Sequence, residues 1–417
     1  PADPPVVEPY AEVGTYGGTL IQYGVDLETD FFQYIGGAIG REGLVRGRPD
    51  GTGFVEWIAK DVELVENDTV AQITFHEGMR WSDGTPFVAA EEYAFYFNET
   101  LPAAGVDPAM QDPGITGVEV VDDNTVRIGL DRPFPVFMVQ FHTAFAPDVL
   151  EEQIPLAPAH VMREYLPRFV GEEEALARAQ ALGFDSVGPL LVALSDQVLT
   201  IDEPRFGVPV TDAYVAVSRN ESELVLERNP YYPFVDTAGN QLPYIDRIVV
   251  RFAAQADNVE LQAIGGGSDV LVSAARTDHI PVYIENQEQG AFATRIYQDA
   301  ALSKPFYVFN MTPPDPRYGA YFSDVRFRRA MSLALDRDQI NDRFYFGRGT
   351  PMQATISPAH ELFRPEYATA YAQHDPEQAR ALLDEAGLVD RDGDGVGDFP
   401  DGSPFTVRMM YAQEEYL

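Results

Sequence analysis

The chain has 417 residues, of which 45% are hydrophobic and 12% aromatic, and it contains no cysteine. This composition is typical of a folded protein of two or three domains, and it excludes disulfides, thiolate metal sites and cysteine nucleophiles. The formal charge is −37 and the only lysines are Lys60 and Lys304, so no nucleic-acid partner is expected. No apolar run approaches the roughly 20 residues of a membrane span, so the chain is not expected to cross a membrane.

The first half of the chain mixes predicted strands and helices. Tyr16-Gly-Gly-Thr-Leu-Ile-Gln-Tyr23 predicts a turn that leads into a short strand. Asp122-Asp-Asn124 predicts an Asx turn that joins two alternating strands into a hairpin. The leader that starts at Pro1 is rich in Pro and Glu and is expected to be mobile. Strands are expected at 54–59, 62–66, 70–76, 118–121 and 125–130, and helices at 89–98, 157–165 and 172–181.

The second half continues this mixture. Strands are expected at 215–217, 224–227, 245–252 and 305–310, and the third of these is too apolar to lie at a sheet edge. The amphipathic stretch Ser323–Ile340 predicts one helix, with Ser323 or Asp324 as its N-cap. Asp375–Gly387 predicts a helix with an Asp N-cap, Pro at the first position and Gly after the last turn.

Three motifs follow one another along the chain. They are Phe75-His-Glu-Gly-Met-Arg-Trp81 with Asp83-Gly-Thr-Pro-Phe87, then Glu227-Arg-Asn-Pro-Tyr-Tyr232, and then the stretch 323–340. In this order they resemble the family 5 extracellular solute-binding proteins, the peptide, nickel and oligosaccharide receptors of ABC importers. The resemblance extends from about Tyr16 to the last residue.

This resemblance implies a mixed α/β (α+β), two-lobed periplasmic-binding-protein fold of type II, cluster C, with an extra subdomain inserted in the first lobe. Lobe I would comprise 1–52 and 190–252, the inserted subdomain 53–189, and lobe II 253–417. In the family, further second-lobe segments and a return strand follow the point that corresponds to Leu417. The family also implies a monomer in the periplasm or outside the cell, with a lipid anchor in some precursors, and ABC permease subunits as partners.

The resemblance further implies a small solute held between two closing lobes, with oligopeptide and oligosaccharide as close competitors. Nickel is less expected, because no histidine pair stands out. The extension Gly239-Asn-Gln-Leu-Pro-Tyr-Ile-Asp246 resembles a branch that includes oligosaccharide receptors. The loop after the opening strand would contact the solute, and Tyr307 and Asn310 would lie near the inter-lobe region. The loop's candidates are Tyr23, Asp26, Phe32 and Tyr34, with Phe31 and Phe32 as core residues the alternative.

An aspartate-rich loop near the end of the chain has the spacing of a calcium loop. Carboxylates occupy loop positions 1, 3, 5, 9 and 12, and Gly395 occupies position 6, where a sharp turn is needed. The candidate calcium ligands are Asp390, Asp392, Asp394, Asp398 and the carbonyl of Val396. The alternative is a solvated turn, because position 12 holds Asp401 in place of the longer Glu. No cofactor is required by any motif.

Catalytic motifs are absent from the sequence. Neither lysine follows a Gly-rich run, and there is no HExxH zinc motif and no Gly-x-Ser-x-Gly elbow. A non-catalytic receptor is therefore expected. The alternative is a secreted glycoside hydrolase, whose two carboxylates a chain with 66 acidic residues could supply from many pairs.

The excess of acidic residues also leads to a hypothesis about the habitat. A heavily hydrated acidic surface suits a salt-rich medium, where a short Debye length relaxes the self-repulsion of the fold.

Overall fold

The computed structural model describes residues 1, 3–8, 12–25, 43–47, 54–110, 113–137, 158–195, 208–271, 275–296, 307–356, 358 and 362–409. The chain divides into two compact units. Unit 1 comprises Pro1–Pro49, Gly53–Ala275 and Asn286–Phe292, and unit 2 comprises Asp50–Thr52, Arg276–Glu285 and Ala293–Leu417. The lobe and subdomain boundaries expected from the resemblance stay a prediction.

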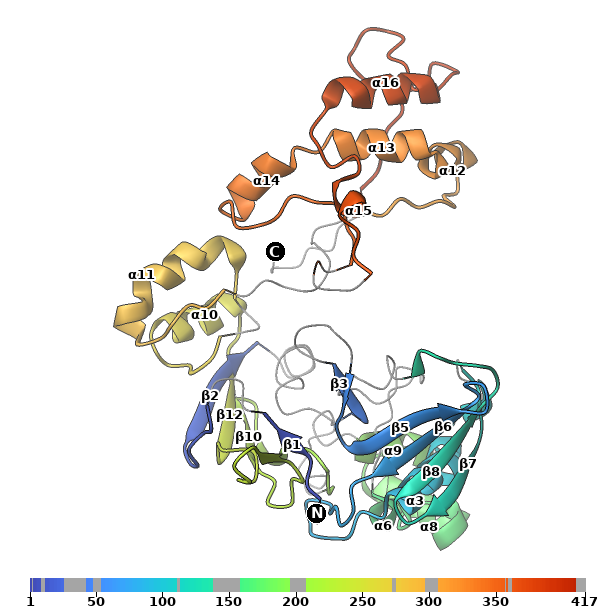
Figure 1. Cartoon of the computed structure of the whole chain (residues 1–417), viewed down its shortest axis with the longest axis vertical. Coiled ribbons are helices and arrows are strands. Elements are labelled where there is room, and N and C mark those ends of the chain that lie inside the picture. The colour runs from blue at the N-terminus through green and yellow to red at the C-terminus, as the bar shows by residue number, and fades with distance from the viewer. Residues whose placement is uncertain are drawn as a thin grey trace. The chain divides into compact units, whose positions relative to one another are not determined.

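The first sheet of unit 1 has the strand order β2-β12-β10-β9 (Figure 1). β2 and β12 are parallel, and the other neighbours are antiparallel. Ile248, Val249 and Val250 are all less than 9% exposed, and this burial places β12 inside the sheet, as its apolar run predicts. The bounds are β2 (Thr19–Gly24), β9 (Tyr214–Arg219), β10 (Glu223–Arg228) and β12 (Arg247–Phe252).

The second sheet of unit 1 is wholly antiparallel, with the order β5-β6-β8-β7. The bounds are β5 (Ala59–Val65), β6 (Val70–Phe75), β7 (Ile115–Asp122) and β8 (Thr125–Leu130). Ala71, Ile73 and Phe75 alternate into the core, which is the period-2 pattern of a half-buried strand. The predicted hairpin is confirmed, because the Asn124 amide donates to Asp122 Oδ1 at 2.9 Å. The short strands β3 (Val45–Gly47) and β4 (Phe54–Glu56) also pair.

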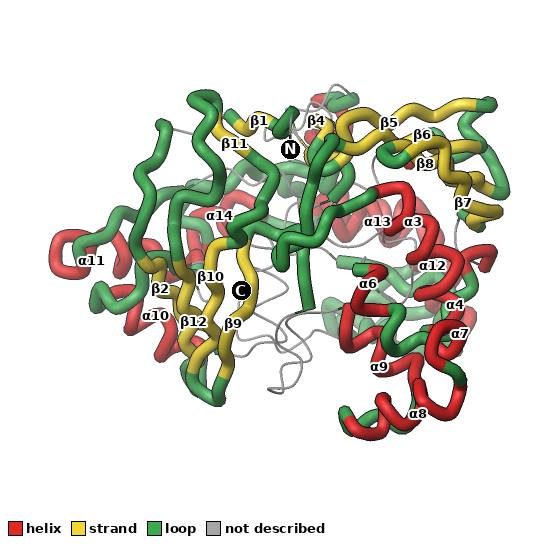
Figure 2. The backbone as a smooth tube through the Cα atoms, turned by 90° about the horizontal axis from the view of Figure 1, so that it is seen from below, coloured by secondary structure: helices red, strands yellow, loops and turns green. Residues whose placement is uncertain are grey.

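Short helices accompany the second sheet, and Figure 2 shows α6 to α9 as one helical group. α3 (Ala89–Phe95) is shorter than the predicted helix 89–98, because the chain continues as a π-helical turn over Tyr96–Thr100. Pro102 explains this change, since it has no N–H to donate and its ring clashes with the carbonyl four residues earlier. The remaining elements are α4 (Leu101–Ala103), η3 (Pro108–Met110), α6 (Ala159–Met162), α7 (Pro167–Val170), α8 (Glu172–Ala181) and α9 (Val187–Ser195).

The leader is bound to the fold over residues 3–8, and for this segment the expectation of mobility was wrong. β1 (Val6–Val7) pairs in parallel with β11 (Val235–Asp236). Asp3 Oδ2 lies 2.5 Å from Lys60 Nζ, and the backbone carbonyl of Asp3 lies 2.8 Å from His76 Nδ1. These contacts come from residues far away in sequence, so composition alone could not predict them.

Unit 1 also contains α10 (Ala256–Ile264). A 3-10 turn (Thr277–His279) and α11 (Ile280–Gly290) follow it in the chain, and their residues up to Glu285 belong to unit 2. Unit 2 contains α12 (Pro316–Ser323), α13 (Val325–Leu333), α14 (Arg337–Phe344), α15 (Pro365–Thr369) and α16 (Pro376–Ala386). The core of unit 2 is aromatic, with Phe309, Phe322, Phe327 and Phe405 in one cluster. No helix within the described ranges is both long and apolar enough to cross a bilayer.

Two predictions in unit 2 were wrong and one is confirmed. The stretch 323–340 forms two helices, since Asp336 starts α14 by accepting the Gln339 amide at 2.9 Å. Residues 307–310 form no strand, so the strand expected at 305–310 is wrong over that part. α16 has the predicted caps, with Asp375 accepting the Gln378 amide and Gly387 in the left-handed region at φ 95°.

Candidate functional site

The carboxyl ends of β2 and β12 form the candidate solute-binding edge of unit 1. The two strands are parallel neighbours, so Gly24 pairs with Phe252 where both strands leave the sheet. In open α/β sheets, ligands bind outside the carboxyl ends of parallel strands, and we take the one parallel pair of this mixed sheet as the corresponding edge. The pair next to the edge is Tyr23 and Arg251. This edge therefore brings an aromatic ring and a cation together.

Tyr23 and Arg251 are in direct contact. Arg251 Nη1 donates to Tyr23 Oη at 3.4 Å, and the guanidinium carbon lies 6.0 Å from the centre of the Tyr23 ring. The hydrogen bond to Tyr23 is the main reason why the pKa of Arg251 is raised. The half-buried Tyr23 ring packs against a small apolar cluster that includes Ala256 and Val259 of α10. The ring is therefore held from the helix side, and the exposed guanidinium lies against it.

The outer edge of β2 is covered by the segment that follows α10. The Asp269 amide donates to the Ile21 carbonyl at 2.8 Å, and the Ile21 amide donates to Asp269 Oδ2 at 2.6 Å. Gln22 and Val270 form an isolated parallel bridge beside them. These contacts cover the outer edge of β2 at Ile21 and Gln22, so β2 is held on both sides directly before Tyr23.

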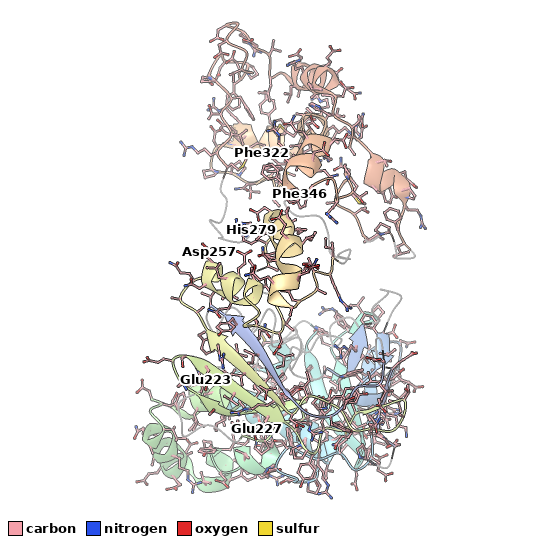
Figure 3. The ribbon with its side chains drawn as sticks, turned by 90° about the vertical axis from the view of Figure 1, so that its left-hand side faces the viewer. Glu223, Glu227, Asp257, His279, Phe322 and Phe346 are labelled. Atoms are coloured by element: carbon pink, nitrogen blue, oxygen red, sulfur yellow. The ribbon has the colours of Figure 1, made fainter. Side chains whose placement is uncertain are left out.

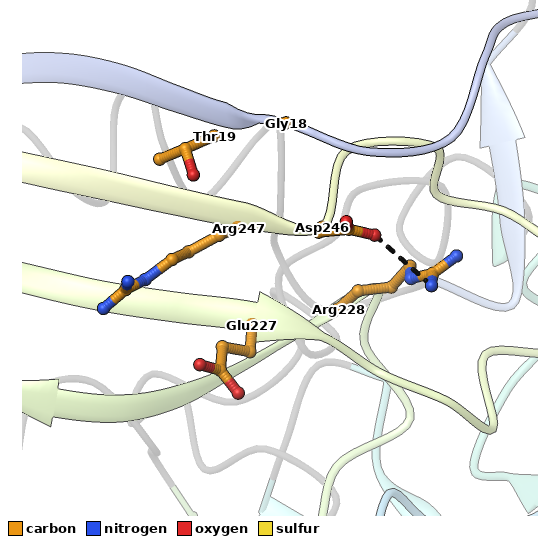
Figure 4. Close-up of a pocket in the computed structure, with 6 residues that line it drawn as sticks. All are labelled: Gly18, Thr19, Glu227, Arg228, Asp246 and Arg247. Carbon is orange, nitrogen blue, oxygen red and sulfur yellow. Dashed lines mark ion pairs between the residues drawn. The ribbon is translucent and has the colours of Figure 1, made fainter.

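A cavity of about 540 Å³ lies at the opposite end of this sheet (Figure 4). Its charged side chains come from β10 and β12 and the residues next to them, and Arg228 forms an ion pair with Asp246 at 3.3 Å. The cavity is open and polar, and none of the predicted site residues lines it. Its lining is Gly18, Thr19, Glu227, Arg228, Asp246 and Arg247. We therefore do not place the solute site in this cavity.

The predicted solute-binding residues fall into three groups. Tyr23 lies at the edge described above, whereas Asp26, Phe32 and Tyr34 lie outside the described residues. Tyr307 and Asn310 belong to unit 2. Tyr307 is 54% exposed. Asn310 Oδ1 accepts the Thr312 amide at 3.0 Å, so this oxygen already serves a turn. Their role in binding stays a prediction.

Arg251 was not among the predicted site residues. The sequence offered one signal, because a charged residue directly follows the apolar run of the strand 245–252. The sequence did not give the register between β2 and β12. This register places Arg251 beside Tyr23, which is 228 positions away in the chain. Pairing over such a distance is set by tertiary structure and not by local pattern.

The aspartate-rich loop brings together three of its predicted calcium ligands. The carboxylate oxygens of Asp390, Asp392 and Asp398 lie within 4.8 Å of one another, whereas Asp394 is outside this group and accepts the Val396 amide. These oxygens suit a hard cation. However, Asp390 also accepts two backbone amides, and Asp398 Oδ2 accepts the Arg391 amide. These bonds order the loop, as do the Asx turns in which Asp392 accepts the Asp394 amide and Asp394 the Val396 amide, so the geometry fits both the calcium loop and the solvated turn.

The motif around Trp81 serves the scaffold. Trp81 is 1% exposed, so it offers no surface for a sugar to stack on. Its indole N–H donates to Glu92 Oε1 at 3.1 Å, and Glu92 Oε2 accepts the Ala159 amide at 2.7 Å. Burial is the largest influence on Glu92 and raises its pKa, while these two hydrogen bonds oppose the rise. Glu92 thus joins the motif to the start of α6.

The chain matches the family described as bacterial extracellular solute-binding proteins, family 5 Middle, over residues 53–416, and it belongs to this family. It is 27% identical over 355 residues to the periplasmic alpha-galactoside-binding protein of Rhizobium meliloti, covering 79% of this chain and 46% of that one. It is 22% identical over 374 residues to the periplasmic oligopeptide-binding protein OppA of Escherichia coli, covering 84% and 56%. The chain spans about half the length of these curated relatives.

Solved structures agree with this family. An oligopeptide-binding protein OppA superposes with a TM-score of 0.74 at 28% identity, covering 96% of this chain and 62% of that one. The periplasmic binding protein MelB of Agrobacterium fabrum C58, in complex with stachyose, superposes with a TM-score of 0.61 at 22% identity, covering 94% and 59%. The predicted fold class, a two-lobed periplasmic-binding-protein fold with mixed helices and sheets, is confirmed.

Proposed function

We propose that this protein is a solute receptor of an ABC importer and binds an oligosaccharide or an oligopeptide at the carboxyl ends of β2 and β12. The observation that carries the proposal is the pairing of Tyr23 with Arg251 at this edge, in a chain of the solute-binding family. A tyrosine ring and a guanidinium offer an apolar face and several N–H donors, which suit either solute.

Both solute classes have support among the relatives. One relative is named for alpha-galactosides and another for oligopeptides, and MelB was solved with stachyose. The relatives are named as binding proteins, which supports binding without turnover over the glycoside hydrolase alternative. We also propose that the protein acts in the periplasm or outside the cell with permease subunits as its partners, and the names of the two periplasmic relatives support this location.

The action of such a receptor rests on differential affinity. A solute that touches both lobes stabilises the closed state more than the open state, and only this difference shifts the population toward closure. The permease would then recognise the closed form. No bond of the solute needs to break in this cycle.

Calorimetry on the full-length protein with stachyose and with short peptides tests the proposal. We expect stoichiometric binding to one class, with the solute recovered intact by chromatography. Tyr23→Ala should weaken binding about 2- to 12-fold, the amount expected for one aromatic contact. Tyr231→Ala is the control, because Tyr231 is 41% exposed and lies in the turn after β10. Cleavage of the sugar, or equal effects of both variants, would contradict the proposal.

A further inference from the structure

We propose that Arg251 selects a solute that carries a carboxylate, which the guanidinium binds at the carboxyl end of β12. The inference rests on the proposed function and names the chemistry of its solute. Two sources supply this group, the free C-terminus of a peptide and the uronic acid of an acidic oligosaccharide.

The first support is the preorganisation of the guanidinium. Arginine has five N–H donors in a planar fork, and the contact with Tyr23 uses Nη1 at 3.4 Å. The ring beneath the guanidinium limits its freedom, so less side-chain entropy is lost when a ligand binds. The remaining donors are available for a carboxylate, which arginine binds through two parallel hydrogen bonds.

The second support is that the guanidinium has no ion-pair partner within the described part of the chain, where no carboxylate lies within 4.0 Å of it. Two other solvent-accessible arginines are paired within the fold, Arg317 with Asp315 at 2.8 Å and Arg326 with Asp324 at 2.6 Å. With 66 acidic and 29 basic residues, internal carboxylates are plentiful. An exposed arginine that stacks on a ring without a carboxylate, at the end where ligands bind, is therefore suited to an external anion.

The third consideration is the field around the site. The net charge of −37 repels anions over the whole surface, so an anionic solute needs a specific cation. One acid beside the site is Glu223, the cross-strand partner of Arg251, whose charge also raises the pKa of Arg251. Figure 3 shows Glu223 nearer than Glu227 to the α10 end of the sheet. Glu223 competes with the solute carboxylate for the guanidinium of Arg251, so removing the charge of Glu223 should strengthen the binding of an anionic solute.

Arg247 is a matched control, because it lies on β12 four residues before Arg251 and on the same face of the sheet. Arg247 pairs in register with Thr19 and Glu227, just as Arg251 pairs with Tyr23 and Glu223. Both arginines thus lie between a hydroxyl-bearing residue and a glutamate. Arg247 is at the amino end of β12, away from the proposed solute edge, and its hydroxyl neighbour is not aromatic.

The experiment compares two pairs of probes on the full-length protein by calorimetry. The first pair is tetra-alanine and its C-terminal amide, and the second is digalacturonate and galactobiose. We expect the acidic member of one pair to bind about tenfold more tightly than its neutral partner, and the pair that responds identifies the source. Arg251→Gln should reduce this preference to less than about twofold, because the acidic member loses more affinity than the neutral member.

Two further variants separate this effect from a general change of charge. Arg247→Gln removes the same charge and should leave the preference intact, and Glu223→Gln should increase it. Circular dichroism confirms that each variant is folded. Equal binding of acidic and neutral partners, or a preference that survives in Arg251→Gln, overturns the inference and leaves the proposed function standing. If none of the four probes binds, both the inference and the proposed solute classes fall.

Discussion

The aromatic core of unit 2 leads to a quantitative prediction. Phe327 of α13 is 1% exposed, and its ring centre lies 5.5 Å from that of Phe309, 5.6 Å from Phe322 and 5.7 Å from Phe405. Phe327→Ala removes a fully buried ring and its three aromatic contacts, which should cost about 3–5 kcal/mol of the free energy of unfolding. For a unit of this size we expect the unfolding temperature to fall by roughly 10 °C.

Differential scanning calorimetry of the full-length protein measures this change, with near-UV circular dichroism to follow the aromatic packing. The matched control is Phe344→Ala, because Phe344 is 61% exposed on α14 and its loss should change the free energy of unfolding by no more than about 0.5 kcal/mol. The loss of stability is expected because Phe327 is buried, so equal shifts of the unfolding temperature in the two variants would refute the reasoning. A shift below about 1 kcal/mol for Phe327→Ala alone would also refute it.

Three other predictions concern pH, calcium and salt. Burial opposes the ionisation of Asp236, but hydrogen bonds from Tyr244 and Asn240 outweigh it and lower its pKa to about 2. The ionised Asp236 therefore stabilises the fold fully above the ordinary pKa of 3.8, and this stabilisation is lost as the pH falls toward 2. Asp236→Asn should make the stability of the fold depend less on pH in that window, as followed by circular dichroism. If the aspartate-rich loop binds calcium, about 1 mM CaCl₂ should raise the unfolding temperature, and Asp392→Asn should remove the rise while the exposed Asp384→Asn keeps it. An unfolding temperature that is the same in calcium and in chelator would favour the solvated turn. Because salt screens the charge of −37, the unfolding temperature should also rise with KCl, and a flat series would end the salt-habitat hypothesis.

Local signals in the sequence predicted those elements whose ends are fixed by neighbouring residues. The caps of α16 at Asp375 and Gly387 are one example, and the turn at Asp122 is another. The break at Asp336 was missed, although Asp is a common N-cap, because the apolar spacing of the stretch favoured one continuous helix. The helical pattern is thus a weaker guide to a boundary than the cap itself.

Contacts between residues that lie far apart in the chain could not be predicted from the sequence. The segment around Asp3 is ordered by Lys60 and His76, and the candidate site combines residues of β2 and β12 that lie more than two hundred positions apart. Tyr23 was a candidate from the sequence because the resemblance assigns ligand contacts to its loop, and its role in binding stays a prediction. Arg251 could not be predicted, since a register shift of one residue would place it on the other face of the sheet.

The strong preference for arginine over lysine gains a physical reason from the structure. A guanidinium is planar and weakly hydrated, so it stacks on aromatic rings as well as binding carboxylates, whereas a lysine ammonium is a compact and strongly hydrated charge. Arg317 does both, since it bonds to Asp315 and lies 4.4 Å from the centre of the Phe399 ring. Arg251 likewise lies over an aromatic ring, that of Tyr23, but it has no ion pair in the described part of the chain. A lysine at position 251 could supply the charge but not the oriented fork, so Arg251→Lys should keep only part of the preference for a carboxylate, and calorimetry with the same probes measures how much.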